Sequence, residues 1–126
     1  MLDTKVKLLI ADDEISIRLA MSELFTEFGH SVRSAADGLA ALIEIRKEIP
    51  DVLLSDLNMP GMSGFELLSA VRLSFPSIHL IAMSGAFTGE AIPLGVTADA
   101  FYQKGARLDA LLKIMESLPH MARPIY

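Results

Sequence analysis

The stretch "DVLLSDLNMPG", residues 51–61, places one carboxylate, Asp56, between an apolar run and a turn. The run at residues 52–55 is typical of a β-strand buried on both faces, and the adjoining Pro60 and Gly61 are typical of a turn. In an open parallel sheet, functional groups lie outside the carboxyl ends of the strands. Asp56 is therefore the first candidate for a functional residue.

The composition is that of one compact domain. The chain has 126 residues, of which 52% are apolar, and this proportion supports a continuous core. The apolar residues never run unbroken for the roughly 18 positions that a membrane-spanning helix needs. The N-terminal stretch also turns acidic where a signal peptide would stay apolar. We therefore expect a cytoplasmic protein that does not insert into membranes.

Residue types and charge argue against several kinds of site. The chain has no cysteine, which excludes disulfides and thiolate metal sites, and its three histidines, His30, His79 and His120, lack the spacing of metal ligands. The net charge of −5, with eleven dispersed basic residues, argues against a surface for nucleic acid. We expect no direct nucleic-acid binding.

Short β-rich apolar runs alternate with segments of helical period, which predicts an α/β fold with a parallel sheet covered on both faces. Strands are expected at residues 6–11, 31–35, 52–55, 78–83 and 100–103. Amphipathic helices are expected between the first four strands and again at residues 108–118. The stretch 85–99 contains Gly89, Pro93 and Gly95, so only one or two turns are expected there. Residues 119–126 are expected to be a frayed end or the start of a linker.

Polar side chains gather where the predicted strands end: Asp12, Asp13 and Glu14 after the first, Asp56 after the third, Ser84 after the fourth and Lys104 after the fifth. Strand ends of a parallel sheet share one edge, so these groups should converge. Like charges about 4 Å apart repel by about 4 kcal/mol at an effective dielectric of about 20, and a hard divalent cation removes that cost. An oxygen-only set suits Mg²⁺ better than zinc.

This set of groups is suited to phosphoryl transfer. The Ser84 hydroxyl, the Lys104 charge and Mg²⁺ suit phosphoryl oxygens, and Asp56 is then a candidate nucleophile that becomes an acyl phosphate. Each residue also has a structural alternative. Asp12 or Asp13 would be a helix cap, Asp56 or Ser84 would form a turn, and Lys104 would be a solvated surface charge.

Four motifs, in this order, resemble the receiver domains of two-component response regulators. They are "LLIADDE", "SDLNMPGMSG", "IAMSG" and "FYQK", and the resemblance runs from about residue 7 to residue 118. It implies one receiver domain at residues 1–118 with a flavodoxin-like (βα)5 three-layer sandwich. Its five-stranded parallel sheet would have the order 2-1-3-4-5, and its fourth helix would be atypically short.

The resemblance also implies a chemistry for the site. Asp56 would accept the phosphoryl group from a histidine kinase or a histidine phosphotransfer protein. Mg²⁺, with Mn²⁺ as the alternative cation, would be held by Asp12, Asp13, Asp56 and the backbone carbonyl of Asn58. Lys104 would bind the phosphoryl group.

Four further positions would sense or tune phosphorylation. By analogy with the family, Ser84 moves toward the phosphoryl group and Phe101 rotates inward to fill the vacated space. Asn58 and Ala86 occupy the positions where family members admit or screen attacking water. Because Ala86 is small, the sequence predicts a labile acyl phosphate.

Two departures from the family pattern stand out. Most receivers follow the lysine with a proline in a cis peptide, whereas Gly105 follows Lys104 here, which predicts a trans bond or a rearranged loop. The segment 84–104 is short and contains Pro93, although in the family the surface beside it carries output or dimer contacts. We expect a different partner surface, which a dimer joined through residues 89–96 on phosphorylation would contradict.

Two other functions compete with a phosphorylation switch. A phosphohydrolase of the haloacid dehalogenase type also uses an aspartate at a strand end, but it needs a second aspartate two residues later, where this chain has Asn58. The other is a receiver-like interaction module that works without phosphorylation. Gly105 and the broken fourth helix favour that alternative, whereas the intact acidic and lysine positions oppose it.

Overall fold

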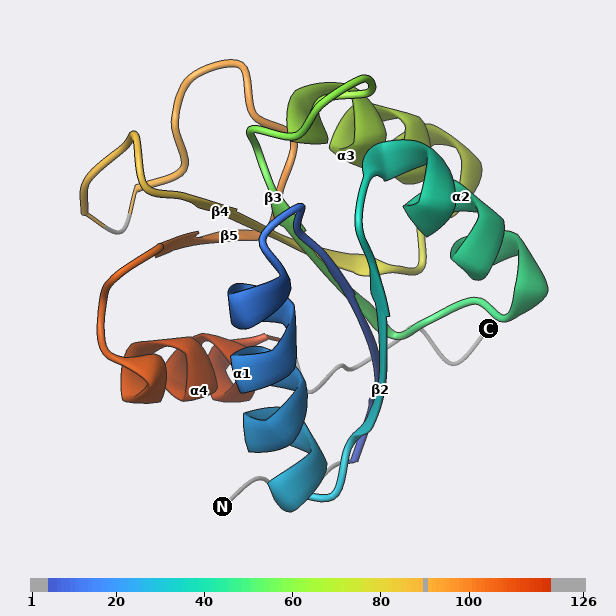
Figure 1. Ribbon diagram of the computed structural model, residues 1–126. Helices are drawn as coiled ribbons and strands as arrows, with labels where there is room; N and C mark the ends of the chain where they lie inside the picture. The colour runs from blue at the N-terminus through green and yellow to red at the C-terminus, as the bar shows by residue number, and fades with distance from the viewer. Residues whose placement is uncertain (1–4, 90, 119–126) are drawn as a thin grey trace.

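The computed structural model describes residues 5–89 and 91–118. Five strands and four helices follow one another along the chain (Figure 1). They are β1 (Lys7–Ala11), α1 (Ile15–Glu27), β2 (Ser31–Ala35), α2 (Gly38–Lys47), β3 (Val52–Asp56), α3 (Gly64–Ser74), β4 (His79–Ser84), β5 (Ala100–Gln103) and α4 (Leu108–Ser117). None of the helices in this part of the chain is long and apolar enough to cross a bilayer.

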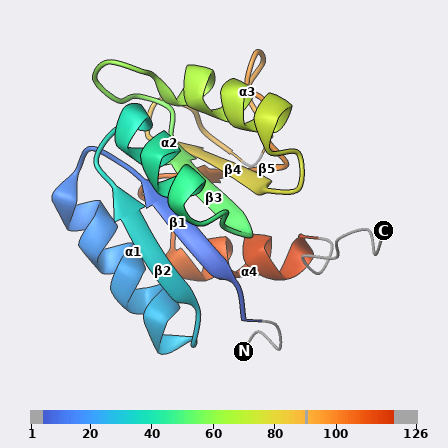
Figure 2. The same cartoon turned by 90° about the vertical axis from the view of Figure 1, so that its right-hand side faces the viewer.

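The strands form one parallel sheet in the order β2-β1-β3-β4-β5. Helices α2 and α3 cover one face and α1 and α4 cover the other, which gives three layers (Figures 1 and 2). The predicted flavodoxin-like α/β fold and its strand order are therefore confirmed. The carboxyl ends of β1, β3, β4 and β5 lie at the same edge of this sheet.

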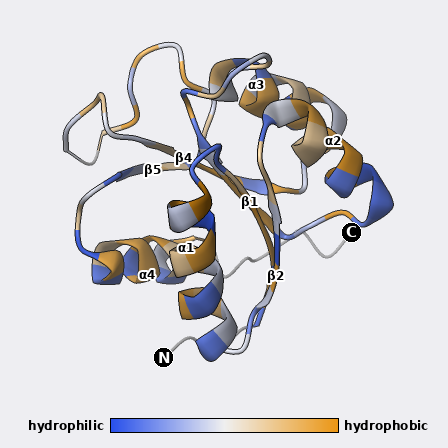
Figure 3. Cartoon of the chain, in the orientation of Figure 1, coloured by the Kyte–Doolittle hydropathy of each residue, from blue (hydrophilic) through white to orange (hydrophobic). Residues whose placement is uncertain are grey.

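The core consists of two apolar layers, one on each side of the sheet. Side chains of a strand alternate between its faces, so Leu9 and Leu53 pack toward α2 and α3, whereas Leu8 and Leu54 pack toward α1 and α4. All five residues of β3 are buried. In Figure 3 the central strands of the sheet are largely orange, whereas orange and blue alternate along the helices. Asp56 thus stands at the end of the most enclosed strand.

The segment between β4 and β5 differs from the sequence expectation. No helix is present in residues 85–89 or 91–99, so the expected short helix is corrected to a loop with one turn, closed by the Val96 N–H and the Pro93 carbonyl at 3.2 Å. Gly89 and Gly95 have φ of +89° and +81°, values that interrupt a helix. The Lys104–Gly105 bond is trans, as predicted. The expected tail at residues 119–126 lies outside the described residues.

The first residue of helix α3 packs against the end of strand β3, where Asp56 lies. Ser63 caps it with a capping box, in which its hydroxyl accepts the Glu66 N–H and the Glu66 carboxylate accepts the Ser63 N–H. The next residue, Gly64, packs so closely that an added Cβ would stand 1.9 Å from the Asp56 carbonyl oxygen. The loop after β3 therefore closes back onto the strand end, and only glycine fits there.

A Gly64→Ala substitution tests this contact. The added methyl group meets rigid backbone, so we expect the free energy of unfolding to fall by about 3 kcal/mol or more. A Gly85→Ala control has open space around its Cβ and should change the free energy of unfolding by less than about 0.5 kcal/mol. Urea unfolding followed by circular dichroism measures both variants. Equal stability of the two would contradict the packing described here.

Candidate functional site

Three predicted carboxylates meet at the carboxyl edge of the sheet. Asp12, Asp13 and Asp56 each offer a carboxylate oxygen, and these oxygens all lie within 4.8 Å of one another. Asp12 and Asp56 are buried, whereas Asp13 is exposed. Asp56 and Ser84 are the last paired residues of β3 and β4, one position later than predicted, so the sheet itself holds both.

The Asp12 side chain is fixed by the start of helix α1. Its Oδ1 accepts the Glu14 N–H at 2.9 Å, and its backbone carbonyl accepts a hydrogen bond from the Arg18 guanidinium at 2.7 Å. Its Oδ2 is buried and accepts no hydrogen bond within the part of the chain that the structure describes, although Lys104 Nζ lies 3.0 Å away. The Lys104 ammonium group is thus the electrostatic partner of this buried oxygen in the described chain.

The ammonium group of Lys104 lies among carboxylates. Its Nζ is 2.5 Å from Glu14 Oε1, 3.0 Å from Asp12 Oδ2 and 3.3 Å from Asp56 Oδ2. Burial lowers the pKa of Lys104, but the contacts with Glu14, Asp12 and Asp56 outweigh it and raise the pKa above its ordinary value. Lys104 is therefore a permanent cation, yet the site as a whole stays negative.

The pKa of Asp56 is raised, and its causes are all visible in the structure. Burial raises it most, and the neighbouring Asp12 carboxylate raises it further. The Asn58 N–H, 3.2 Å from Asp56 Oδ1, and Lys104 act in the opposite direction. The carboxylate is thus placed where its negative charge is costly and where an added cation would relieve that cost.

Ser84 and Phe101 lie beside this cluster. The buried Ser84 Oγ accepts the Ala86 N–H at 3.0 Å and receives a longer contact of 3.4 Å from the Asn58 side-chain amide. The Phe101 ring is already buried and meets the Phe87 ring edge-on, with the ring centroids 6.5 Å apart. The structure thus brings Ser84, Asn58 and Ala86 together, and it shows the Phe101 ring buried.

Two residues at the site had no predicted role. Glu14 follows the acidic pair in the sequence, but its contact with Lys104 joins positions 90 residues apart. Phe87 lies in the segment that was expected to hold a short helix, so its contact with Phe101 had no sequence signal. The sequence placed Glu14 with the groups expected at this edge, but it gave Glu14 no chemical role.

The donor set fits a hard divalent cation. The groups that face one another are carboxylate oxygens, two of them on buried residues, and one of these oxygens accepts no hydrogen bond. Oxygen ligands of this kind are those that Mg²⁺ takes in proteins, usually with several waters retained. Asp12, Asp13 and Asp56 could therefore hold such an ion.

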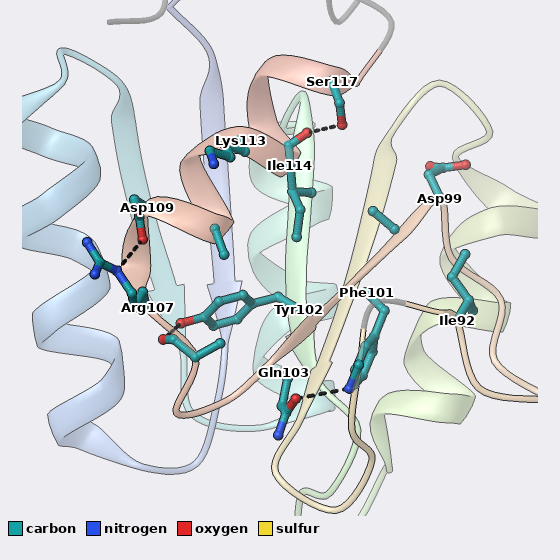
Figure 4. A pocket seen from close by; sticks show the side chains of 14 residues that line it. Ile92, Asp99, Phe101, Tyr102, Gln103, Arg107, Asp109, Lys113, Ile114 and Ser117 are labelled. Carbon is teal, nitrogen blue, oxygen red and sulfur yellow. Dashed lines mark hydrogen bonds and ion pairs between the residues drawn. The ribbon is translucent and has the colours of Figure 1, made fainter.

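A separate groove of about 920 Å³ runs along the outer side of β5 (Figure 4). Residues of β5, one face of α4, and Gly89 and Ile92 of the loop after β4 line it. The Gly89 N–H donates to Gln103 Oε1 at 3.0 Å and ties this loop to β5. The loop before β5 contains no helix in residues 85–89 and 91–99, so no helix from this loop covers the groove.

Comparison with known proteins agrees with this geometry. The family model "Response regulator receiver domain" matches residues 8–116. The chain belongs to this family. Receiver domains are signalling switches of two-component systems rather than classical enzymes, and they generally bind Mg²⁺ at an acidic pocket, which this chain reproduces as its aspartate cluster.

Individual relatives share sequence with this receiver domain. "Sporulation initiation phosphotransferase F" of Bacillus subtilis is 40% identical over 78 residues, which are 62% of this chain and 63% of that protein. "DNA-binding transcriptional regulator NtrC" of Klebsiella pneumoniae is 35% identical over 97 residues, which are 77% of this chain and 19% of NtrC. The chain thus spans less than two thirds of the length of these curated relatives.

Solved receiver structures superpose closely on this one. The chemotaxis response regulator CheY4 of Vibrio cholerae has a TM-score of 0.78 at 35% identity, with 90% of this chain and 98% of that chain covered. The response regulator TrrA of Thermotoga maritima, in complex with Mg²⁺-BeF, has a TM-score of 0.80 at 26% identity, with 90% and 97% covered.

Asp13→Asn tests the repulsion among the carboxylates. With EDTA present, removing the exposed charge should raise the free energy of unfolding by about 0.5 to 1 kcal/mol, and added salt should shrink that gain. Glu23→Gln removes an equal charge from an exposed position of α1 and should change the free energy of unfolding less. Chemical unfolding at two salt concentrations measures both. Loss of stability in Asp13→Asn would contradict a repulsive cluster.

Proposed function

We propose that this receiver domain is a phosphorylation switch, in which a phosphoryl group carried on a histidine of a kinase or phosphotransfer protein is transferred to Asp56. The observation that carries the proposal is the Asp56 carboxylate, set among Asp12, Asp13 and Lys104 at the end of a buried strand. The proposal extends to residues 1–118 as the receiver domain and to residues 119–126 as a tail or the start of a linker.

The transfer uses the chain's own groups in defined roles. A carboxylate oxygen of Asp56 forms a bond to phosphorus, the P–N bond of the phosphohistidine breaks, and its electron pair stays on the imidazole nitrogen. Lys104 and the Ser84 hydroxyl bind phosphoryl oxygens. Asp12, Asp13, Asp56 and the backbone carbonyl of Asn58 would hold Mg²⁺ or Mn²⁺. When bound, such an ion neutralises negative charge that develops on the phosphoryl oxygens.

Local contacts supply a route from the phosphoryl group to the surface. Ser84 Oγ is bonded to the Ala86 N–H, so a hydroxyl that turns to the phosphoryl group gives up a contact with the loop after β4. Phe87 of that loop packs against Phe101 of β5. A shift of a few kcal/mol between two arrangements of this region is enough to change partner binding.

The relatives support this assignment over the alternatives. One is named as a phosphotransferase and another was solved with Mg²⁺-BeF. A phosphorylation-independent module is less favoured because the acidic residues, Ser84 and Lys104 are all present and in contact or close proximity. Under this proposal the chain acts in the cytoplasm, with a partner surface near the open groove that differs from the usual one.

Intact-mass measurement after incubation with acetyl phosphate and Mg²⁺ tests the proposal. We expect the chain to gain one phosphoryl group, as acetate leaves, and to gain none in Asp56→Asn or in excess EDTA. Asp109→Asn, an exposed aspartate of α4, is the matched control and should react like the unchanged chain.

Two results would count against a phosphorylation switch at Asp56. One is no mass gain in the unchanged chain under conditions that modify a known receiver, and the other is an undiminished gain in Asp56→Asn. The same sample, after removal of the donor, gives the lifetime of the acyl phosphate, which the small Ala86 leads us to expect to be short.

A further inference from the structure

The shortest contact of Lys104 is with a residue outside the expected phosphoryl site. Glu14 Oε1 lies 2.5 Å from Lys104 Nζ, whereas Asp56 Oδ2 lies 3.3 Å from it. Glu14 is more than half exposed, at 56% of its side chain, whereas the Lys104 side chain is 13% exposed. The ammonium group is therefore drawn toward the rim of the site as well as toward Asp56.

Glu14 is an unusual residue for the position that it occupies. It is the N-cap of α1, where Ser, Thr, Asp or Asn normally accepts an N–H of the first turn. Its side chain makes no such capping bond and instead reaches Lys104 across the site. A helix-capping role therefore does not explain Glu14, and the contact with Lys104 is its principal interaction.

The backbone around Lys104 differs from a loop in which proline follows the lysine. The lysine is followed by Gly105 in a trans peptide with a φ of +94°, a backbone that has no ring to restrict it. The backbone is held before that point, where the Lys104 N–H donates to the Ser84 carbonyl at 3.0 Å. Beyond it, the Ala106 N–H donates to the Gln103 carbonyl at 3.0 Å, so the turn places the Lys104 side chain and its ion pairs orient the ammonium group.

We propose that Glu14 is a positioning residue that competes with the phosphoryl group for Lys104. This inference rests on the proposed function of Asp56. In the unphosphorylated chain Glu14 shares the ammonium group with Asp12 and Asp56 and makes the shortest contact with it. When a phosphoryl group is bound at Asp56, Lys104 turns from Glu14 to a phosphoryl oxygen, and the Glu14 carboxylate is left beside a new negative charge. Glu14 thus opposes phosphorylation and limits how far the switch is populated.

Beryllium fluoride is the probe for this competition, because the solved TrrA complex contains it with Mg²⁺. At saturating Mg²⁺, Glu14→Gln should bind beryllium fluoride about two- to fivefold more tightly than the unchanged chain, because the exposed ion pair and one repulsive charge are gone. Raising the salt concentration should reduce the difference in beryllium fluoride affinity between Glu14→Gln and the unchanged chain, since salt screens an exposed charge. Tryptophan is absent from the chain, so NMR titration of the Ala86 and Gly89 amides is the readout.

A second variant separates positioning from helix stability. Glu14→Ser provides a proper N-cap, so it should raise the melting temperature while tightening beryllium fluoride binding as Glu14→Gln does. Glu23→Gln removes an exposed charge from the same helix and should leave binding unchanged. A purely structural role for Glu14 would move stability without a salt-dependent change in affinity.

The outcomes distinguish this inference from the proposed function. Suppose that the unchanged chain binds beryllium fluoride and that both Glu14 variants bind it equally well or more weakly. The inference that Glu14 competes for Lys104 is then wrong, whereas the proposed phosphorylation of Asp56 is unaffected. If the unchanged chain binds no beryllium fluoride with Mg²⁺, the assignment of Asp56 and the inference built on it both fail.

Discussion

Repulsion among carboxylates at one edge of a buried sheet is the constraint on which the site depends. Asp12, Asp13 and Asp56 offer oxygens within 4.8 Å of one another, and Lys104 is the cation that touches two of them. Each pair of like charges at such a distance costs several kcal/mol at an intermediate dielectric. An arrangement of this kind persists because the fold imposes it, and it favours any ligand that brings positive charge.

The fold imposes the arrangement through its most rigid parts. Asp56 ends a strand whose five residues are all buried, and Gly64 closes the following loop against its carbonyl. Asp12 is held by the first turn of α1, and Ser84 is still paired with β5. Ala86 and Phe87, which contact Ser84 and Phe101, lie instead on the loop after β4, where no helix is present in the described residues. The charges are therefore held by strands and helix starts, whereas their contacts toward the surface run through a loop without a helix.

Much of this could be predicted from the sequence, because the relevant signals are local. Buried parallel strands leave apolar runs, and the residues that follow those runs must share an edge, so Asp12, Asp13, Asp56, Ser84 and Lys104 were found by position alone. Asp56 and Ser84 proved to be the final residues of their strands because the ladder extends one pair further than the apolar run.

The remaining features depend on contacts between distant positions. The sequence placed Glu14 at the same sheet edge as Lys104, but it did not indicate that the two side chains form an ion pair, and the packing of Phe87 on Phe101 depends on a loop path that propensity does not determine. The expected short helix after β4 failed because glycines of positive φ and Pro93 allow only one turn. The low helix propensity of glycine and proline predicted a short helix in this segment, but it did not predict that the helix would be absent from residues 85–89 and 91–99.

The central claim is that the carboxylate cluster is built to take a divalent cation. Isothermal titration calorimetry of the chain with Mg²⁺, beside Asp12→Asn, tests it most directly. The account predicts binding of one Mg²⁺ per chain that is abolished or greatly weakened in Asp12→Asn, since that change removes the negative charge of a buried ligand. Absence of binding, or equal binding by the chain and the variant, would contradict it.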